Sequence, residues 1–413
     1  MHPLQPHYRN LPNEVLRMIF STLTDTHPRR PEALYNLLFV SRRVNAIAKP
    51  LFYRHVAIYC GLHYFGTEDD CLGFQACLHS LARSIASDSG ASGAFVQALN
   101  LSIPERTVAD GHERWLGETL ELLLPHLPNL RKLTTFYIGA AEWPTAHLSL
   151  LPNPAKLTIL TVNIVHDYPA FLEFLRACPL LECLYVDTVE DKNGILPETI
   201  PPDVIPRLRA VCCSPDFLYF CILAGRRIEH VNTFSDMPFA VYGNDPDMDA
   251  LAAPMALVRS LAVEGSMSLE DILRAKVIAP YSHVEFLAIG IEDEIGVGDA
   301  QTMGELWSKE LRYIYLQCEG CVPDHDAVAE AFLVAMPSLV ILDVEIYRKG
   351  ASRVSPRCTR YLRGNPREKN TDIQFVFPIC DDLQEPLWVE EVEDLDGYRG
   401  REGEVCYQRR VRK

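Results

Sequence analysis

The sequence has no long apolar run, and its basic residues are comparatively few. Its 413 residues contain no stretch of 18 consecutive apolar residues, so we expect no transmembrane helix. Its 39 Lys and Arg residues are outnumbered by 55 Asp and Glu residues, which gives a net charge of -16. This balance argues against a nucleic-acid binder, whose surface is basic, and against adhesion to anionic lipid. We therefore expect neither nucleic acid nor a membrane among its partners.

The start of the chain lacks the features of a secretory signal. Residues 1–20 contain no basic segment followed by an apolar core and a small-residue cleavage site. We therefore expect an intracellular protein, cytoplasmic or nuclear, whose thiols stay reduced. The 13 cysteines are odd in number and scattered, which favours small buried hydrophobic residues over a disulfide framework. Cys178, Cys212, Cys213 and Cys318 fit such buried positions.

Motifs that carry common enzyme chemistry are also missing. The sequence has no Gly-x-Ser-x-Gly elbow, no Walker loop, no dinucleotide glycine fingerprint and no His-Glu-x-x-His. Cys318-x-x-Cys321 is a single pair, whereas a zinc site needs about four ligands. Asp324-His325-Asp326 follows Pro323 and is better explained as an exposed turn with an Asp helix cap. We expect no catalytic residues, no metal and no cofactor.

The first fifty-six residues contain three short helical patterns. The first has apolar residues at i, i+3, i+4 and i+7 and begins near Pro12. The third starts near Ser41, a suitable N-cap, and is expected to end before Pro50. The apolar positions of the first and second patterns are Leu16, Ile19, Phe20 and Leu23, then Leu34, Leu37, Leu38 and Val40.

Three helices of this size bury too little surface for comfortable independent stability. They form either a small cap on a larger domain or a docking module that completes its core with a partner.

The residues of these three helices also follow a longer ordered motif. The motif is Leu11-Pro12-x-Glu14-Val15-Leu16-x-x-Ile19-Phe20-x-x-Leu23, then Leu37-x-x-Val40-Ser41-Arg42-x-x-Asn45-x-x-Ala48, then Pro50-Leu51-x-Tyr53-Arg54-x-Val56.

This ordered motif resembles an F-box, and the resemblance spans about residues 10–56. Ser41 stands where Cys is frequent in the family, and Asn45 stands where Trp is usual. The resemblance implies docking to the Skp-type adaptor of a cullin–RING ubiquitin ligase, with apolar helix faces in a groove. Each motif residue could equally belong to the internal core, because helical spacing does not reveal which neighbour covers it. By position, the adaptor-binding residues are Leu11, Pro12, Val15, Leu16, Ile19, Phe20, Leu37, Val40 and Leu51.

Residues 57–380 contain a recurring pattern, apolar-x-x-apolar-x-apolar, often two residues after a proline. Successive copies are separated by about 26 residues on average, within the 20–29 range of leucine-rich repeats. We expect one short strand in each unit, with a helical return between several of them. The copies begin at Leu130, Leu157, Leu181, Leu208, Ile228, Val258, Val284, Leu311 and Leu339, with earlier ones at Val96 and Val56. The helices are expected at residues 114–124, 168–177, 216–224, 269–277 and 327–335.

The series resembles the irregular leucine-rich repeats that follow F-boxes in fungal proteins. It lacks the usual Asn after the third apolar position in nearly every unit. The expected fold is α/β: an N-terminal three-helix F-box at residues 8–56 followed by a leucine-rich repeat solenoid, or horseshoe, at 57–380. Residues 381–413 alternate in charge, and we expect them to form a flexible tail. The competing fold is an ordinary α/β domain.

The expected function is that of a substrate-recognition subunit of an SCF-type ubiquitin ligase. Residues 1–56 carry a net charge of +5 and the remaining chain -21, so the target could present a basic patch, although solubility alone also explains the acidity. A leucine-rich repeat scaffold that never meets an adaptor remains an alternative, as does a divergent hydrolase. Variable positions beside the repeat pattern could face the target: Thr158, Glu182, Tyr185, Arg312 and Tyr315.

Overall fold

The structure is a computed structural model. It describes residues 11–26, 32–59, 68–103, 113–137, 145–165, 167–189, 200–214, 217–218, 226–234, 253–270, 283–307, 309–319, 325–347, 357–363 and 365–368. The chain divides into two compact units, Met1–Leu181 and Glu182–Lys413. The division falls within the repeat series, and the expected tail at residues 381–413 lies outside the described residues. Within those ranges, no helix has the length and apolarity needed to cross a membrane.

The first unit begins with three helices, α1 (Asn13–Thr26), α2 (Glu32–Leu37) and α3 (Arg42–Arg54). The Ser41 hydroxyl accepts the Val44 N–H at 3.1 Å, so Ser41 is the predicted N-cap of α3. The prediction that this helix ends before Pro50 is wrong, because α3 continues through the proline to Arg54. Pro50 removes one helical hydrogen bond, but Leu51 and Phe52 beyond it pack against the core of the three helices, which offsets that loss.

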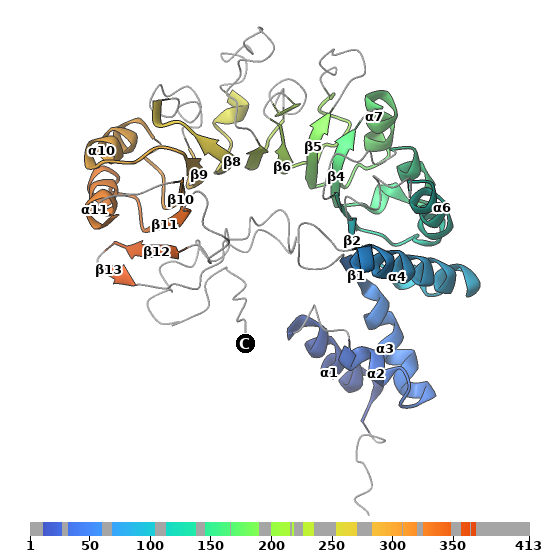
Figure 1. The fold of residues 1–413 in the computed structure, drawn as a ribbon. Helices are drawn as coiled ribbons and strands as arrows, with labels where there is room; N and C mark the ends of the chain where they lie inside the picture. Colours follow the sequence, from blue (N-terminus) through green and yellow to red (C-terminus); the bar gives the residue numbers. More distant parts are fainter. Residues whose placement is uncertain are drawn as a thin grey trace, which may run out of the picture. The chain divides into compact units, whose positions relative to one another are not determined.

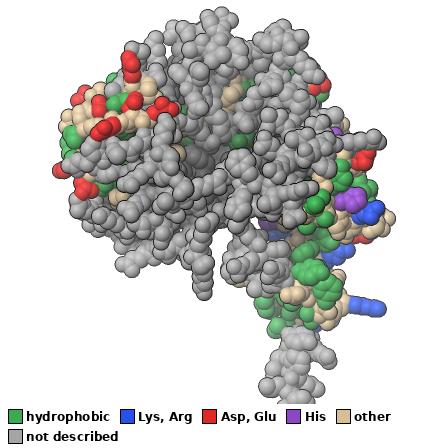
Figure 2. Space-filling view, viewed as in Figure 1, with side chains coloured by type: hydrophobic (Ala, Val, Ile, Leu, Met, Phe, Trp, Pro, Cys, Tyr) green, Lys and Arg blue, Asp and Glu red, His purple; other side chains and the backbone are tan. Residues whose placement is uncertain are grey.

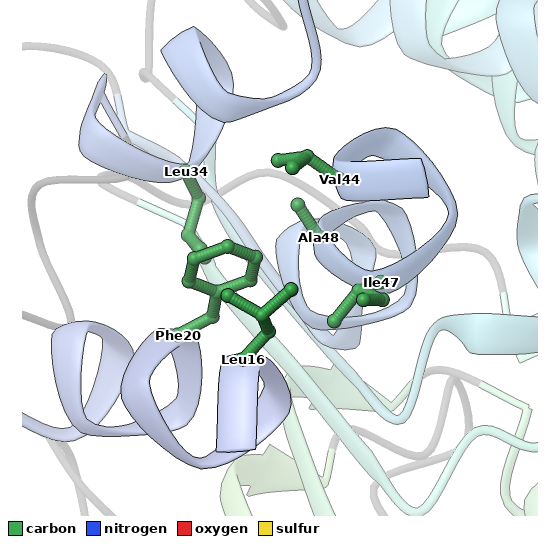
Figure 3. Packing of buried hydrophobic residues seen from close by; sticks show 6 residues of the cluster. All are labelled: Leu16, Phe20, Leu34, Val44, Ile47 and Ala48. Carbon is green, nitrogen blue, oxygen red and sulfur yellow. The ribbon is translucent and has the colours of Figure 1, made fainter. Parts of the chain in front are cut away.

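The core of this helical unit is small. Figure 3 shows its buried side chains converging from all three helices: Leu16, Phe20, Leu34, Val44, Ile47 and Ala48. Five partly buried side chains pack around them: Leu11, Leu37, Leu38, Leu51 and Phe52. Leu16 and Phe20 of the predicted first helical period therefore belong to the core, since they are only 5% and 6% exposed, whereas Ile19 of the same period is 45% exposed.

The remainder of the first unit is built on four parallel strands that pair in chain order (Figure 1). These strands are β1 (His55–Tyr59), β2 (Ala98–Ile103), β3 (Lys132–Tyr137) and β4 (Ile159–Val165). The connecting helical elements are α4 (Glu68–Ser87), η2 (Gly93–Phe95), α6 (Glu113–Leu123), η3 (Leu124–His126), η4 (Thr145–Leu150), η5 (Pro154–Lys156) and α7 (Tyr168–Arg176). Leu99, Leu133 and Leu160 are aligned across β2, β3 and β4 and are fully buried.

The second unit continues the same construction with seven parallel strands in chain order. They are β5 (Cys183–Val189), β6 (Ala210–Cys213), β7 (His230–Phe234), β8 (Ser260–Met267), β9 (Phe286–Ile291), β10 (Tyr313–Glu319) and β11 (Ile341–Tyr347). Helices α10 (Val297–Leu306) and α11 (His325–Ala335) lie between its last strands. Two antiparallel strands that the sequence did not predict follow β11: β12 (Arg357–Leu362) and β13 (Asn365–Glu368).

The repeat pattern located the strands closely. In all nine copies the strand starts two residues after the first apolar position, as with Leu130 and β3 or Leu311 and β10. The expected helices at 114–124, 168–177 and 327–335 are confirmed as α6, α7 and α11. Those at 216–224 and 269–277 lie mostly outside the described residues. Within each unit, chain-order pairing fits a repeat array, whereas a doubly wound α/β domain reverses its strand order.

One backbone interaction recurs between successive repeats. The residue just before a strand uses its carbonyl to accept two N–H groups of the next repeat. The Arg209 carbonyl, for example, accepts the N–H groups of Glu229 at 2.8 Å and His230 at 3.0 Å. The other carbonyls that accept such a pair are those of Gln97, Arg131, Glu182, Glu229, Arg259, Glu285 and Arg312. This repeated contact sets the register between neighbouring repeats.

Two glycines of α10 provide a matched test of the packing between helices. A Cβ on Gly304 would lie 2.4 Å from the Ala335 Cβ of α11, whereas one on Gly298 would meet nothing within 4 Å. We expect Gly304→Ala to lower the free energy of unfolding by about 1–3 kcal/mol because the two helices must separate. Gly298→Ala should raise it by up to about 1 kcal/mol through helix propensity. Urea titration of both variants measures the difference, and equal effects would contradict the close approach.

Candidate functional site

The helical unit exposes large apolar side chains that its own core does not use. The exposed fractions of these side chains are 66% for Met18, 45% for Ile19, 51% for Tyr35, 70% for Phe39 and 52% for Val40. The rings of Tyr35 and Phe39 are in edge contact, with centroids 5.0 Å apart. Figure 2 shows hydrophobic side chains on the surface of this unit. Exposed apolar groups gathered on one small unit are typical of a protein-docking surface.

The predicted adaptor-binding residues divide between this surface and the core. Pro12, Ile19 and Val40 are exposed and accessible to a partner. Leu16 and Phe20 lie inside the core, while Leu11, Leu37 and Leu51 are partly buried against it and Val15 is half-buried. Contact between these nine residues and an adaptor stays a prediction.

Sequence reasoning did not select Met18, Tyr35 and Phe39, although they are among the most exposed apolar residues of the helical unit. The helical period identifies the face that turns toward the core, so it passes over apolar residues on the opposite face. The feature of the sequence that could have identified these three residues is that they are apolar at positions outside that period. We take Met18, Ile19, Tyr35, Phe39 and Val40 together as the apolar docking surface of the helical unit.

The two residues that depart from the F-box pattern have structural roles here. Ser41 caps α3, and the Asn45 amide donates to the Leu38 carbonyl at 2.8 Å, at the connection between α2 and α3. Arg43 adds a further link, because its Nε donates to Asn13 Oδ1 at 2.8 Å. Each departure therefore satisfies backbone groups at a helix end.

The helical unit is joined to the repeats without a linker. Helix α3 ends at Arg54 and β1 begins at the next residue. The Arg54 carbonyl accepts the Gln97 N–H at 2.9 Å, and the Arg54 Nε donates to Gln97 Oε1 at 3.2 Å. Lys49 Nζ lies 3.4 Å from Asp88 Oδ2, which also accepts the Ser92 N–H at 3.0 Å. The Ser92 hydroxyl, the Ser92 N–H and Lys49 lower the pKa of Asp88, against a raising effect of burial.

The strands of the second unit have a helix face and an open face. Tyr361, the register partner of Leu342, donates its hydroxyl to Asp326 of α11 at 3.2 Å. Arg363 Nε donates to the Leu339 carbonyl at 2.7 Å, just beyond the end of α11. Leu342 and Tyr361 therefore lie on the helix face. Because side chains alternate along a strand, Ile341 and Asp343 lie on the open face.

The proposed target-facing residues fall into two groups. Glu182 and Arg312 precede their strands and bridge to the next repeat through their carbonyls, and Thr158, which precedes β4, donates its N–H to the Arg131 carbonyl. In the second unit the side chains of the carbonyl-bridging positions alternate in charge: Glu182, Arg209, Glu229, Arg259, Glu285 and Arg312. Arg209 Nη2 lies 3.5 Å from Glu182 Oε2, and Arg259 Nη2 lies 2.6 Å from Glu285 Oε1. Ion pairing between repeats therefore supports the register.

Tyr185 and Tyr315 form the second group, and both lie on the open face. Their exposed fractions are only 8% and 2%, so neither is freely available to a target as the chain stands. Tyr315 belongs to a separate apolar cluster with Phe286, Ala288, Tyr313 and Ile341. The buried Asp343 beside it is neutralised, because Arg360 donates to its two oxygens at 2.7 and 2.6 Å. The Tyr313 hydroxyl adds a hydrogen bond to Asp343 at 3.0 Å.

The open face of the first unit carries a row of polar side chains. Asn100, Thr134 and Thr161 are aligned on β2, β3 and β4. Asn100 Oδ1, Thr134 Oγ1 and Thr161 Oγ1 are buried and have no hydrogen-bond partner within the described part of the chain. A buried hydroxyl without a partner destabilises the fold, so this row costs stability.

Two adjacent-strand threonines test this cost with the same substitution. The Thr135 hydroxyl donates to the Thr161 carbonyl at 2.9 Å, whereas the Thr161 hydroxyl has no partner among the residues that the structure describes. Thr161→Val should therefore raise the free energy of unfolding by about 1 kcal/mol, and Thr135→Val should lower it by about 1 kcal/mol. Denaturant titration distinguishes the two. Destabilisation of equal size in both variants would show that the Thr161 hydroxyl has a partner after all.

The predicted buried cysteines are confirmed as buried: Cys178, Cys212, Cys213 and Cys318. Burial raises the pKa of the Cys178 and Cys318 thiols to about 12, so both stay protonated and unreactive near neutral pH. No group of three or more potential metal ligands occurs among the residues that the structure describes. Cys321 and Asp324, which the sequence offered as possible ligands, lie outside those residues.

His230 is a buried titratable group between two cations. It lies on β7, is 7% exposed, and is flanked by Arg209 and Arg259 of the neighbouring repeats. Burial, together with the positive charges of these arginines, lowers the pKa of His230 to about 4. The folded chain therefore holds this imidazole neutral at pH values where a free histidine is protonated.

The stability of the fold should depend on pH through His230. Between pH 6.5 and about 4 the unfolded chain binds this proton and the folded chain does not, so stability falls as pH falls. From pH 7.5 to 5 the loss should be about 2 kcal/mol. His230→Gln should remove this part of the pH dependence, measured as the difference between wild-type and variant unfolding curves. Parallel curves for the two proteins would contradict the lowered pKa.

Comparison with known proteins yields little. No protein-family model matches the sequence, and no curated protein matches it. One similar solved structure is that of the leucine-rich repeat-containing protein LegL7 from Legionella pneumophila, at 13% identity. The similarity covers 76% of this chain and 92% of that chain, with a TM-score of 0.39. A similarity this low supports no conclusion about function.

Proposed function

We propose that this chain is the substrate-recognition subunit of an SCF-type cullin–RING ubiquitin ligase. The N-terminal helices bind a Skp-type adaptor, and the repeat array binds a target protein. One observation carries the proposal: the F-box-like residues fold into a three-helix unit whose own surface exposes Met18, Ile19, Tyr35, Phe39 and Val40. The motif and the docking surface belong to the same small unit.

The magnitude of the exposed surface supports a docking role. Complete burial of a Met, Ile, Phe or Val side chain contributes roughly 1.5–3 kcal/mol. Burial of several side chains from the apolar docking surface can therefore exceed the cost of association, provided that a few of them act as central anchors. Among the residues of this surface, Phe39 has the largest exposed fraction, 70%, that binding could remove from water.

The proposed subunit performs no covalent chemistry itself. It raises the effective concentration of the target beside a ubiquitin-loaded enzyme. The direct junction between Arg54 and β1, with hydrogen bonds from Gln97, suits this role because it limits motion between the helical unit and the first repeats.

The charge of the repeats suggests the chemistry of the target. Exposed acidic side chains follow β9 at Glu292, Asp293 and Glu294, and others lie on α10 and α11 at Glu305 and Glu330. Figure 2 shows acidic side chains on the surface in the region of these two helices. We expect a target that presents a basic patch, because complementary charge steers association.

A second candidate is a protein-interaction scaffold that meets no adaptor. Leu16 and Phe20 favour it, because two of the predicted adaptor contacts are already used in the core. Ser41 and Asn45 favour it too, since both serve helix ends within the unit. Adaptor binding decides between the two candidates.

Adaptor binding is tested by a pull-down with purified Skp-type adaptor and the full-length chain. Ile19→Asp should weaken binding at least thirtyfold, because burial of an unpaired carboxylate costs about 2 kcal/mol or more. Phe39→Ser/Val40→Ser should weaken it comparably by removing apolar contact area. The Leu11→Ala/Pro12→Ala variant tests the start of the motif in the same assay.

The matched control is Arg17→Gln, an exposed position on the same helix that should leave binding unchanged. Circular dichroism and the unfolding midpoint must show that each variant is folded, which the exposure of Ile19, Phe39 and Val40 favours. If folded wild-type protein fails to bind the adaptor, the ligase proposal is wrong and the scaffold candidate replaces it.

A further inference from the structure

Helices α10 and α11 expose apolar side chains on the face turned away from the core. Val297 of α10 is 41% exposed, and Val334 of α11 is 71% exposed, the largest exposed fraction of any large apolar side chain in the described part of the chain. Phe332, two residues before Val334, is fully buried and stacks on Trp307, with ring centroids 5.9 Å apart. Helix α11 is therefore apolar both toward the core and away from it, which is typical of a helix that is covered on both sides.

Exposed side chains four residues apart form one row on each helix. The two rows adjoin because the helices touch, since a Cβ on Gly304 would lie 2.4 Å from the Ala335 Cβ. Each helix connects two parallel strands, so the two run in the same direction and their C-terminal ends are level. Each row spans about 12 Å. We call these two rows the outer face: Val297, Gln301 and Glu305 on α10, and Asp326, Glu330 and Val334 on α11.

The outer face is acidic around its apolar side chains. Neither helix contains a lysine or an arginine. Glu305 and Glu330 are exposed, and within the described residues neither carboxylate takes part in an ion pair. The nearby Lys309 donates to the Gly304 and Glu305 carbonyls at 3.0 and 3.2 Å, so its ammonium is used at the C-terminal end of α10. Figure 2 shows acidic side chains beside hydrophobic ones in the region of α10 and α11.

These properties specify the chemistry of a partner. Val297 and Val334 are buried favourably only against apolar side chains. Covering Glu305 and Glu330 costs free energy unless cations pair with them, and complementary charge also speeds association. Nucleic acid and anionic lipid carry the wrong charge for such a face. A helix fits best, because the side chains of a third helix interdigitate with those of two adjacent helices.

We propose that the outer face of α10 and α11 is a docking surface for a basic amphipathic helix of a partner protein. Apolar side chains of the partner pack on Val297 and Val334, and its lysines or arginines pair with Glu305 and Glu330. This surface lies on the helix side of the repeats and is additional to the open faces of the strands. The inference rests on the proposed function in taking the target to be a protein with a basic patch, whereas adaptor docking does not depend on it.

The test measures binding of the full-length chain to a fluorescein-labelled peptide by fluorescence anisotropy. The peptide is a helix of about 15 residues with leucines on one face and lysines on the other. We expect Val334→Ser to weaken binding about fivefold by removing apolar contact. Glu330→Lys should weaken it about tenfold, because an attraction becomes a repulsion. Both variants should bind the adaptor as wild type does, so failure of this inference and failure of the ligase proposal give different results.

Two matched controls change the same residue types elsewhere. Leu72→Ser removes an apolar side chain that is 54% exposed on α4, and Glu121→Lys reverses an exposed charge on α6. Both should bind the peptide as wild type does, and a peptide with glutamates in place of its lysines should not bind. Failure of folded wild-type protein to bind would overturn the proposal. Equal weakening in the controls and in the α10 and α11 variants would also overturn it, because the peptide would then bind unspecifically.

A second measurement covers the case in which a variant fails to fold. Benzoylphenylalanine at position 334 of the otherwise unaltered chain should crosslink to the labelled peptide on irradiation, and the same group at position 72 should not. Equal crosslinking from both positions would overturn the proposal. Crosslinks from position 334 that join only two copies of the protein would also do so, because the outer face would then bind a second copy.

Discussion

The packing of the repeats depends on one backbone contact that recurs between successive repeats in both compact units. The carbonyl just before a strand accepts two N–H groups of the next repeat, as the Arg209 carbonyl does from Glu229 and His230. This contact holds successive strands in parallel and in register, so each buried leucine or valine of the pattern stacks on its counterpart. Alternating side-chain charges along the same line, such as Arg259 against Glu285, reinforce the register.

The same construction leaves the two ends of the chain with different tasks. At the start, α3 passes into β1 without a linker, and the helical unit has a small core of its own and a surface that exposes Met18 and Phe39. At the end, β12 turns back antiparallel and brings Arg360 to Asp343, which closes the parallel series with a buried ion pair. Exposure at one end and closure at the other are consistent with docking through the helices.

The open faces of the strands carry buried polar, aromatic and titratable side chains. In the first unit Thr134 and Thr161 bury hydroxyls that find no partner in the described part of the chain, a stability cost that a packing role does not explain. In the second unit the aromatic cluster around Tyr315 is deeply buried. His230 lies between them in the chain and is held neutral by burial and by Arg209 and Arg259. These features make the open faces the part of the array where function is best sought.

The sequence by itself determined the strand of each repeat, the N-cap at Ser41 and the burial of the cysteines, because each follows from a local pattern or from residue type. Only the tertiary structure decided that α3 runs through Pro50, since the stabilising free energy that offsets the lost hydrogen bond comes from the packing of Leu51 and Phe52 on the core of the three helices. It also decided that Leu16 and Phe20 face the core while Ile19 faces solvent. Spacing identifies an apolar face but not the neighbour that covers it, and that neighbour is set by contacts between residues distant in the chain.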